Sequence, residues 1–373
     1  MSSVPYSSRP ATPHVRELDW LMLVTVALCC LGLVMAVSIV GSRYEVGALA
    51  AMKTQGVKLL VGVVAFLGAA LVPIRLVRRF ALPAFLAMVV CCVLASFLTD
   101  VKGAGRWIRF AGMQFQPVEP ARFFLVLVMA SLMANAGEQL RTFTRGFLPA
   151  MGCAVLLAAA LVIQPDNGNA LIVLGLATVL ALVAGVRFLH FAPFALLGFA
   201  GLVTYALQHD YVRNRLSDFG ATSASSQVGL GLIAVGSGGL FGRGLGQGWM
   251  KMGFVPEAHN DWVFSIIAEE LGYLGSLFVL LAFTAFGYLG YRLVCKVRDP
   301  FLRFVVCGYS VLICMQAAIN LLVVSGWAPA KGIDLPFVST GGTSLVFCLA
   351  AVGLIGNAAR ADAMAADHAT LRR

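Results

Sequence analysis

Charged residues are scarce in this sequence. Asp, Glu, Lys and Arg together make up 12% of its 373 residues, whereas 60% of the residues are hydrophobic. A soluble domain needs a charged surface, and a disordered chain is poor in apolar residues, so this composition excludes both classes. Alternating strands of about 10 residues are also absent, which excludes a transmembrane barrel. The remaining class is an all-α polytopic membrane protein.

Metal, redox and nucleic-acid motifs are missing as well. Nearly all of the nine cysteines lie inside apolar runs, and no CxxC or Cys/His spacing occurs, so we interpret them as small buried hydrophobic residues. The net charge of +10 is scattered between apolar runs and forms no basic stripe, which argues against a nucleic-acid partner. An anionic lipid headgroup fits this charge better.

Ten apolar runs approach the length of about 20 residues that a membrane-spanning helix needs. The first is too long for a signal-peptide core and follows a polar lead, so we expect it to stay as a helix. We predict a single membrane domain over 20–360, cytoplasmic tails at 1–19 and 361–373, and a large extracytoplasmic loop at 209–261, between helices 7 and 8. The runs are 20–40, 56–73, 80–98, 118–136, 147–163, 169–186, 188–208, 262–291, 301–324 and 343–360.

Lys and Arg set the predicted orientation. Of the 27 basic residues, fifteen fall on the side that the two termini share. Eight lie on the other side once the four in the long loop are set aside. The positive-inside rule therefore places both termini in the cytoplasm.

Basic residues that stay outside against this bias indicate an anionic ligand there. Lys102, Arg106 and Arg109 surround Trp107 in a short amphipathic segment ahead of the fourth helix. An interfacial anchor is the alternative, with Trp107 in the aromatic belt and the arginines snorkelling toward water.

The stretch 256–272 carries the densest group of ionisable residues. Glu257, His259 and Asp261 come just ahead of the eighth apolar run, where a charged group indicates a functional site. Either Asn260 or Asp261 also fits the N-cap of that helix, and both roles are compatible. His259 with Asp261 supplies too few ligands for a metal site. We interpret Glu269 and Glu270, two turns further in, as structural partners of polar groups on neighbouring helices.

Glu119 and Arg122 are spaced i, i+3 at the start of the fourth helix. Pro120, between them, fits as a residue of the first helical turn. The spacing puts both charges on one helix face, where they can pair. Charged residues at such depth usually face a bundle interior or a wet cavity. A self-satisfied ion pair that only orients helices is the alternative.

Two further segments are rich in glycine or small polar residues. The run 236–248 lacks the Gly-Lys-Ser/Thr ending of a phosphate loop, so we expect a flexible loop that lets backbone approach a bulky ligand. The run 336–344 opens the tenth helix, where Ser339 or Thr343 is predicted to cap the turn. Asp166, in a short outer connection, is typical of a turn residue.

Together these motifs resemble the SEDS family of cell-wall proteins, which includes FtsW, RodA and a sporulation homologue. Pro-Glu-Ala-His, and Ala330-Lys-Gly332 ahead of Leu-Pro-Phe, are more similar to the division-type FtsW than to RodA. The matching motifs are Gly105-Arg-Trp-Ile108, Gln116-Pro-Val-Glu119, Gln164-Pro-Asp-Asn-Gly168, Ile233-Ala-Val-Gly-Ser-Gly-Gly239, Pro256-Glu-Ala-His-Asn-Asp261, Glu269-Glu-Leu-Gly272 and Leu335-Pro-Phe-Val-Ser339 with Gly341-Gly342.

The resemblance implies a ten-helix SEDS-type bundle and a peptidoglycan glycosyltransferase that polymerises lipid II outside the cytoplasmic membrane. It implies a class B penicillin-binding protein as transpeptidase partner, among other divisome or elongasome membrane proteins. By the family pattern Asp261 matches the essential aspartate, and Glu119 matches the acid of a Glu/Lys pair lining the central cavity. Arg122 stands where the family has lysine, and Thr340 departs from the usual Ser-Tyr-Gly-Gly.

From both lines of argument we expect Asp261 to act as general base on the acceptor's sugar hydroxyl, with lipid II and the nascent glycan strand as the substrates. Positive groups would stabilise the departing undecaprenyl pyrophosphate. The sequence identifies no cofactor that the reaction must have; a divalent cation, Mg or Mn, could assist this step, and its ligands are unassigned. A lipid II flippase and a non-catalytic divisome scaffold are the alternatives. The predicted substrate-binding residues are Arg106, Trp107, Arg109, Glu119, Arg122, Arg243, Lys251, His259, Lys331 and Ser339.

Overall fold

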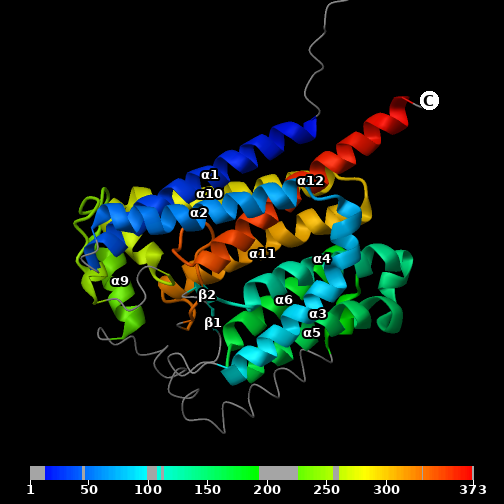
Figure 1. Ribbon diagram of the computed structural model, residues 1–373, viewed down its shortest axis with the longest axis horizontal. Coiled ribbons are helices and arrows are strands. Elements are labelled where there is room, and N and C mark those ends of the chain that lie inside the picture. The colour runs from blue at the N-terminus through cyan, green and yellow to red at the C-terminus, as the bar shows by residue number, and fades with distance from the viewer. Residues whose placement is uncertain are drawn as a thin grey trace, which may run out of the picture.

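The computed structural model describes residues 13–43, 47–98, 107–110, 113–192, 226–254, 260–329 and 331–371, which form a bundle of long helices (Figure 1). Within these residues seven helices are long and apolar enough to cross a membrane, and three shorter apolar helices accompany them. The seven are α1 (Pro13–Arg43), α2 (Ala48–Leu71), α3 (Ile74–Leu98), α4 (Val118–Ala136), α10 (Val263–Lys296), α11 (Pro300–Val324) and α12 (Gly342–Leu371). The shorter ones are α5 (Leu148–Ile163), α6 (Asn167–Val183) and α9 (Gln227–Ser237).

Nine of the ten predicted runs fall on these helices, which confirms a helical multi-pass protein. The run 188–208 lies mostly outside the described residues, so the total of ten helices stays a prediction. Short non-α helices connect the main elements, at Gly137–Arg141, Phe143–Phe147, Phe188–Phe191 and Met250–Met252. α1 and α12 extend into the predicted tails, because helical turns continue once polar side chains find partners. The carboxylate of Asp362 on α12, for example, accepts hydrogen bonds from the N–H groups of Arg298 and Asp299.

The helices differ in how deeply they are buried. In the apolar windows of α4 and α12, 72% of the residues are buried, against 17% in that of α2. α2 packs mainly along α12, and α3 mainly along α4. From their connection at residues 72–73, α2 and α3 diverge, with α4 and α12 behind the opening (Figure 1). Most exposed residues of α2 and α3 are apolar, as the 63% exposure of Leu60 and the 55% exposure of Val90 illustrate.

The two ends of the bundle are distinct. α1 begins and α12 ends at one end, whereas α9 and a small hairpin lie at the other (Figure 1). The hairpin pairs β1 (Ile108–Phe110) with antiparallel β2 (Met113–Phe115), and Arg109 lies opposite Gln114. The segment ahead of α4 was predicted only as amphipathic; its backbone instead forms this sheet. Thr343 of α12 bonds to β2 of the hairpin, since its hydroxyl donates to the Gln114 carbonyl over 3.4 Å.

α10 is interrupted at Gly272, whose φ of 68° and ψ of −158° are not helical. The glycine-rich segment 238–248 fills the interruption. The N–H groups of Arg243 and Gly244 donate to the carbonyls of Glu269 and Glu270, each over 3.0 Å. Gly238 lies so close that a Cβ there would be 1.9 Å from the Ala268 carbonyl oxygen. The backbone of this segment approaches α10, because the broken helix leaves carbonyls that need donors. The expected approach of this loop to a bulky ligand stays a prediction.

Candidate functional site

Asp261 lies at the end of the bundle opposite the termini, just before α10. The first helical residue is Val263, and Trp262 holds the N-cap position without a side-chain capping bond. The N-cap interpretation of Asn260 or Asp261 is therefore wrong. The side chain of Asn260 accepts a hydrogen bond from the Thr340 hydroxyl instead, over 2.9 Å.

Side chains of α11 and of residues 333–340 fix the position of Asp261 by bonding to its backbone and to that of Asn260. The amide nitrogen of Asn320 donates to the carbonyls of Asp261 and Ile333 over 2.8 and 2.7 Å, and this side chain is 1% exposed. The hydroxyl of Ser339 donates to the Asn260 carbonyl over 2.6 Å and accepts from the Leu335 N–H over 2.8 Å. Ser339 therefore positions the residue before Asp261 and closes its own turn, rather than capping α12.

The turn that carries Ser339 has a strained backbone and packs against α1. Phe337 has a φ of 65°, which a side chain other than glycine rarely adopts, and it is 2% exposed. α1 packs against this turn through Gly32, where a Cβ would lie 2.6 Å from the Phe337 carbonyl oxygen. Strained residues of this kind persist where the surrounding structure fixes them, and they gather at functional sites.

The carboxylate of Asp261 faces the segment that contains Lys331. A Cβ on Gly332 would meet a carboxylate oxygen of Asp261 at 3.0 Å. On the other side of this segment, a Cβ on Gly168 would meet the Lys331 stem at 3.1 Å. Lys331 thus lies near both the start of α6 and Asp261, and its predicted contact with substrate stays a prediction.

Glu119 and Arg122 form a buried ion pair on α4, which confirms their predicted pairing. The guanidinium of Arg122 also donates to Asn169 on α6 over 3.0 Å, and Asn169 donates to Asp166 over 2.7 Å. Asp166 caps α6 by accepting from the Asn169 N–H, which refines its interpretation as a turn residue. Arg122 is 1% exposed, and its Nε has no hydrogen-bond partner among the described residues. The chain of contacts ties α4 to the start of α6 beside Lys331.

Lys58 is a candidate that sequence reasoning missed. It interrupts the apolar sequence of α2, and its ammonium donates to the Thr340 carbonyl over 2.7 Å. Its stem lies beside Gly342, where a Cβ would be 3.5 Å away. Thr340 in turn bonds Asn260, so Lys58 belongs to the same network as Asp261. The signal was available in the sequence, because a lone lysine inside an apolar run is costly unless it has a partner or a ligand.

Lys251 occupies a different place from the one predicted. The sequence indicated a cation that faces the substrate, yet Lys251 is fully buried. Its ammonium donates to Glu270 over 2.6 Å and to Ser38 of α1 over 2.8 Å. Glu270 also accepts from the N–H groups of Gly246 and Gly248, and Glu269 from that of Trp249. The predicted structural role of the two glutamates fits these contacts, and Lys251 shares it.

For the other predicted site residues, the described contacts do not lead to Asp261. Arg243 is exposed on the glycine-rich segment, where its Nε donates to the Ser237 carbonyl. Trp107 is half-buried beside β1, which contains Arg109. Arg106 and His259 lie outside the described residues. No group of three or more metal-ligating side chains occurs in the part of the chain that the structure describes, so the metal ligands stay unassigned.

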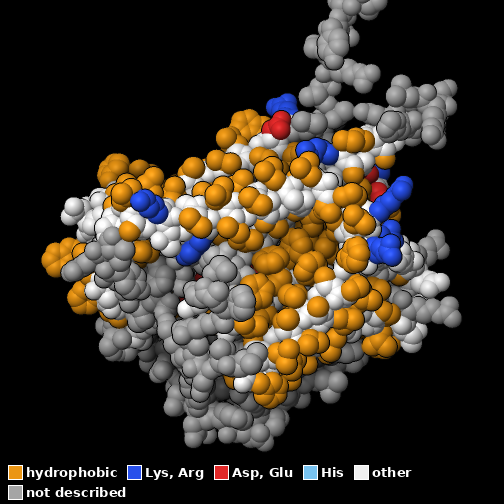
Figure 2. All heavy atoms as spheres, in the orientation of Figure 1, with side chains coloured by type: hydrophobic (Ala, Val, Ile, Leu, Met, Phe, Trp, Pro, Cys, Tyr) orange, Lys and Arg blue, Asp and Glu red, His pale blue; other side chains and the backbone are white. Residues whose placement is uncertain are grey.

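An apolar groove lies between α2 and α3. Figure 2 shows a hollow lined by hydrophobic side chains between α2 and α3, over α4 and α12. Lys58 is the α2 residue that joins this helix to the Asp261 network. The arrangement can therefore accommodate a long apolar chain between helices and a charged head beside Asp261.

The chain is similar to known proteins over most of its length. A family model described as "Cell cycle protein", covering FtsW, RodA and SpoVE, matches residues 19–363. A probable peptidoglycan glycosyltransferase FtsW of Geobacter metallireducens is 35% identical over 349 residues, which are 90% of this chain and 93% of that one. The stage V sporulation protein E of Bacillus subtilis is 35% identical over 69% of this chain and 72% of its own length.

Two solved structures share the fold. A chain from a peptidoglycan synthase complex that coordinates polymerization and crosslinking has a TM-score of 0.77 and 25% identity, covering 92% of this chain and 98% of that one. RodA of Thermus thermophilus has a TM-score of 0.67 and 26% identity, covering 92% of this chain and 96% of its own. With both the family model and these relatives covering most of its length, the chain belongs to the FtsW/RodA/SpoVE family.

Proposed function

We propose that this protein is a peptidoglycan glycosyltransferase that joins lipid II units into glycan strands and releases undecaprenyl pyrophosphate. The carrying observation is Asp261, which is clamped by Asn320 and the 333–340 turn at the end of the bundle opposite the termini. Relatives named peptidoglycan glycosyltransferase support the same activity. With both termini in the cytoplasm, Asp261 lies at the outer face of the membrane.

In the proposed reaction the Asp261 carboxylate takes the proton from a hydroxyl of the acceptor sugar. The hydroxyl oxygen then bonds to the anomeric carbon of the donor, and the bond from that carbon to the pyrophosphate oxygen breaks. One carboxylate is sufficient, because the acceptor itself is the nucleophile. The rigid backbone contacts matter here, since a base must stay within hydrogen-bond reach of the proton it removes.

Negative charge develops on the pyrophosphate as it leaves, and preorganised cations lower the energy of that state. Lys58 and Lys331 approach the Asp261 network from two sides, on α2 and on the segment after α11. Arg122 and Glu119 are a buried pair on α4, and we infer that they hold α4 and α6 in place beside the site through Asn169. Arg106, Trp107, Arg109 and Arg243 remain candidates for headgroup contacts, and Mg or Mn for an auxiliary role.

The polyprenyl tail is proposed to lie in the groove between α2 and α3. Most outward residues of both helices are apolar, and α2 is the least buried of the long helices. A tail in this groove enters from the bilayer without crossing the core. Its pyrophosphate then reaches Lys58, in the N-terminal half of α2.

A class B penicillin-binding protein is the proposed partner, within the division or elongation machinery. A structural neighbour is part of a complex that coordinates polymerization and crosslinking, which supports a transpeptidase partner. The similarity to FtsW sequences favours division.

Polymerisation of purified lipid II tests the proposal directly. The protein is assayed in detergent with and without its cognate transpeptidase, with Mg or Mn, and glycan chains are resolved by length. We expect chains longer than the disaccharide. If no chains form under any condition, while liposomes containing the protein move lipid II between leaflets, the protein is a flippase.

Replacing Lys58 tests the leaving-group site. We expect Lys58→Met to lower kcat about 100-fold, because a preorganised donor to developing negative charge contributes roughly that much. Lys58→Arg should recover part of the rate. The measurement is the initial rate of polymerisation against lipid II concentration, which separates kcat from KM.

Lys53→Met is the matched control, since Lys53 is an exposed lysine on the same helix. It should keep the wild-type rate. Equal rates for Lys58→Met and Lys53→Met would remove Lys58 from the reaction, while the wild-type assay would still establish the polymerase.

A further inference from the structure

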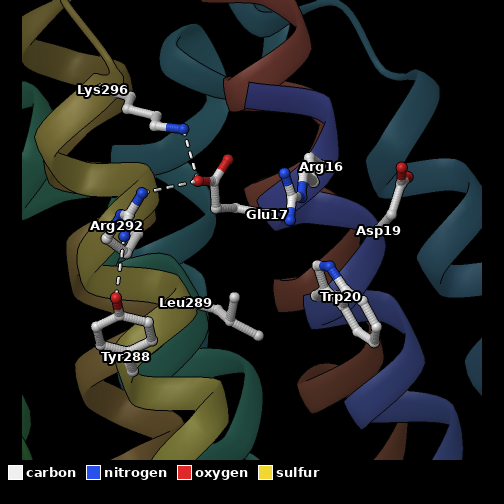
Figure 3. A pocket seen from close by; sticks show the side chains of 8 residues that line it. All are labelled: Arg16, Glu17, Asp19, Trp20, Tyr288, Leu289, Arg292 and Lys296. Atoms are coloured by element: carbon white, nitrogen blue, oxygen red, sulfur yellow. Dashed lines mark hydrogen bonds and ion pairs between the residues drawn. The ribbon is translucent and has the colours of Figure 1, made fainter. Parts of the chain in front are cut away.

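A second charged site lies at the end of the bundle that carries the termini. A cavity of about 700 Å³ opens between the first turns of α1 and the last turns of α10. Figure 3 shows Glu17 of α1 pointing across the gap between the two helices toward Arg292 and Lys296 of α10. They are Arg16, Glu17, Asp19, Trp20, Tyr288, Leu289, Arg292 and Lys296. Nothing in the proposed reaction uses this cavity, which is far along the bundle from Asp261.

The cations in the cavity outnumber the acids by three to two. One oxygen of Glu17 bridges Lys296 and Arg292, over 2.6 and 3.3 Å, so a single carboxylate faces two cations. Arg16 forms no ion pair or hydrogen bond within the described residues. Figure 3 shows Asp19 on the side of α1 away from Arg292 and Lys296. The space between the helices therefore presents a net positive charge.

The cavity lies where the apolar surface of the bundle ends. On α1, Leu23 and Val26 are 56% and 58% exposed, and Trp20 follows them toward the charged residues at 53%. On α10, exposed Leu281 gives way to exposed Tyr288 in the same direction. Tryptophan and tyrosine with arginine and lysine beyond them mark the headgroup level of a membrane. An occupant would therefore enter sideways from the bilayer.

From these observations we infer that the cavity binds the headgroup of an anionic glycerophospholipid. The phosphate meets Arg16 and Arg292, and the acyl chains run down along the exposed apolar residues of α1 and α10. Basic pockets between membrane helices are suited to such headgroups.

Quenching of Trp20 by brominated lipids tests the inference. The full-length protein is placed in nanodiscs that contain phosphatidylglycerol and phosphatidylcholine, with bromine on the acyl chains of one lipid at a time. The Trp20→Phe protein supplies the signal of the other four tryptophans for subtraction. The ratio of the two quenching constants gives the lipid preference at Trp20.

We expect the wild type to prefer phosphatidylglycerol. Arg16→Gln should lower the preference about five-fold, the usual contribution of one basic residue near an anionic surface, and Arg16→Gln with Arg292→Gln should nearly abolish it. Arg75→Gln is the matched control, because Arg75 is an exposed arginine at the start of α3, outside the cavity. It should leave the preference unchanged.

Three outcomes would overturn the inference. The wild type could show no lipid preference at Trp20. Arg75→Gln could lower the preference as much as Arg16→Gln, which would assign it to diffuse surface charge. Lastly, a soluble glutamate-rich peptide could protect Trp20 from acrylamide while lipids are not distinguished, which would assign the cavity to an acidic protein segment.

Discussion

Asp261→Asn should abolish polymerisation of lipid II, with a loss of at least about 100-fold, while the protein stays folded. The substitution keeps the size of the side chain and removes the group that accepts the proton, and general base catalysis contributes about 10²–10⁴-fold. The fixed carbonyl of Asp261, which accepts from Asn320, is unaffected because it belongs to the backbone. The measurement is glycan chain formation from purified lipid II with the cognate transpeptidase present.

The fold and the binding step need their own controls. The thermal unfolding midpoint of Asp261→Asn in detergent should match the wild type, and labelled lipid II should still bind. Asp19→Asn removes the same charge from an exposed residue at the other end of the bundle and should retain full activity. Glycan chains at the wild-type rate from Asp261→Asn would exclude this residue as the base.

Asn320→Ala extends the same experiment. It leaves the carboxylate of Asp261 in place but removes the donor that holds its backbone and that of Ile333. We expect a partial loss of kcat that lies between wild type and Asp261→Asn, because a base displaced from reach transfers protons more slowly.

Lys251→Met should be the most destabilising single change in the loop that follows α9. Lys251 and Glu270 are an ion pair with both side chains 0% exposed. Removing one partner leaves a buried charge without compensation, which costs about 3–5 kcal/mol. The pair also joins Ser38 of α1 to the broken α10 and the glycine-rich segment, so the loss should loosen their packing.

A double-mutant cycle separates the pair from its surroundings. Glu270→Gln with Lys251→Met removes both charges, and we expect it to recover much of the stability that Lys251→Met loses. Lys296→Met is the comparison at a partly exposed pair, with Glu17, and should cost about 1 kcal/mol or less. The readout is the thermal unfolding midpoint in detergent. Additive losses in the double variant would show that the two charges do not stabilise each other.

The sequence alone determined the class of the protein and most of its helices. Membrane-spanning helices follow from long apolar runs, since no water is present in the bilayer to satisfy exposed backbone groups. The i, i+3 spacing of Glu119 and Arg122 similarly predicts their pairing, because local geometry on one helix decides it. The ordered motifs around Asp261 pointed to the family, and that assignment was confirmed.

Contacts between distant segments were decided only by the tertiary structure. Local pattern favoured an N-cap for Asn260, yet Thr340, 80 residues away, takes its side chain. Lys251 was expected to face a ligand, but its ammonium is buried and donates to Glu270 and Ser38. Lys58 joins the network around Asp261 because its ammonium donates to a carbonyl 282 residues further along the chain. A polar group takes the partner that folding brings within about 3 Å of it, and sequence spacing does not encode which distant segment that is.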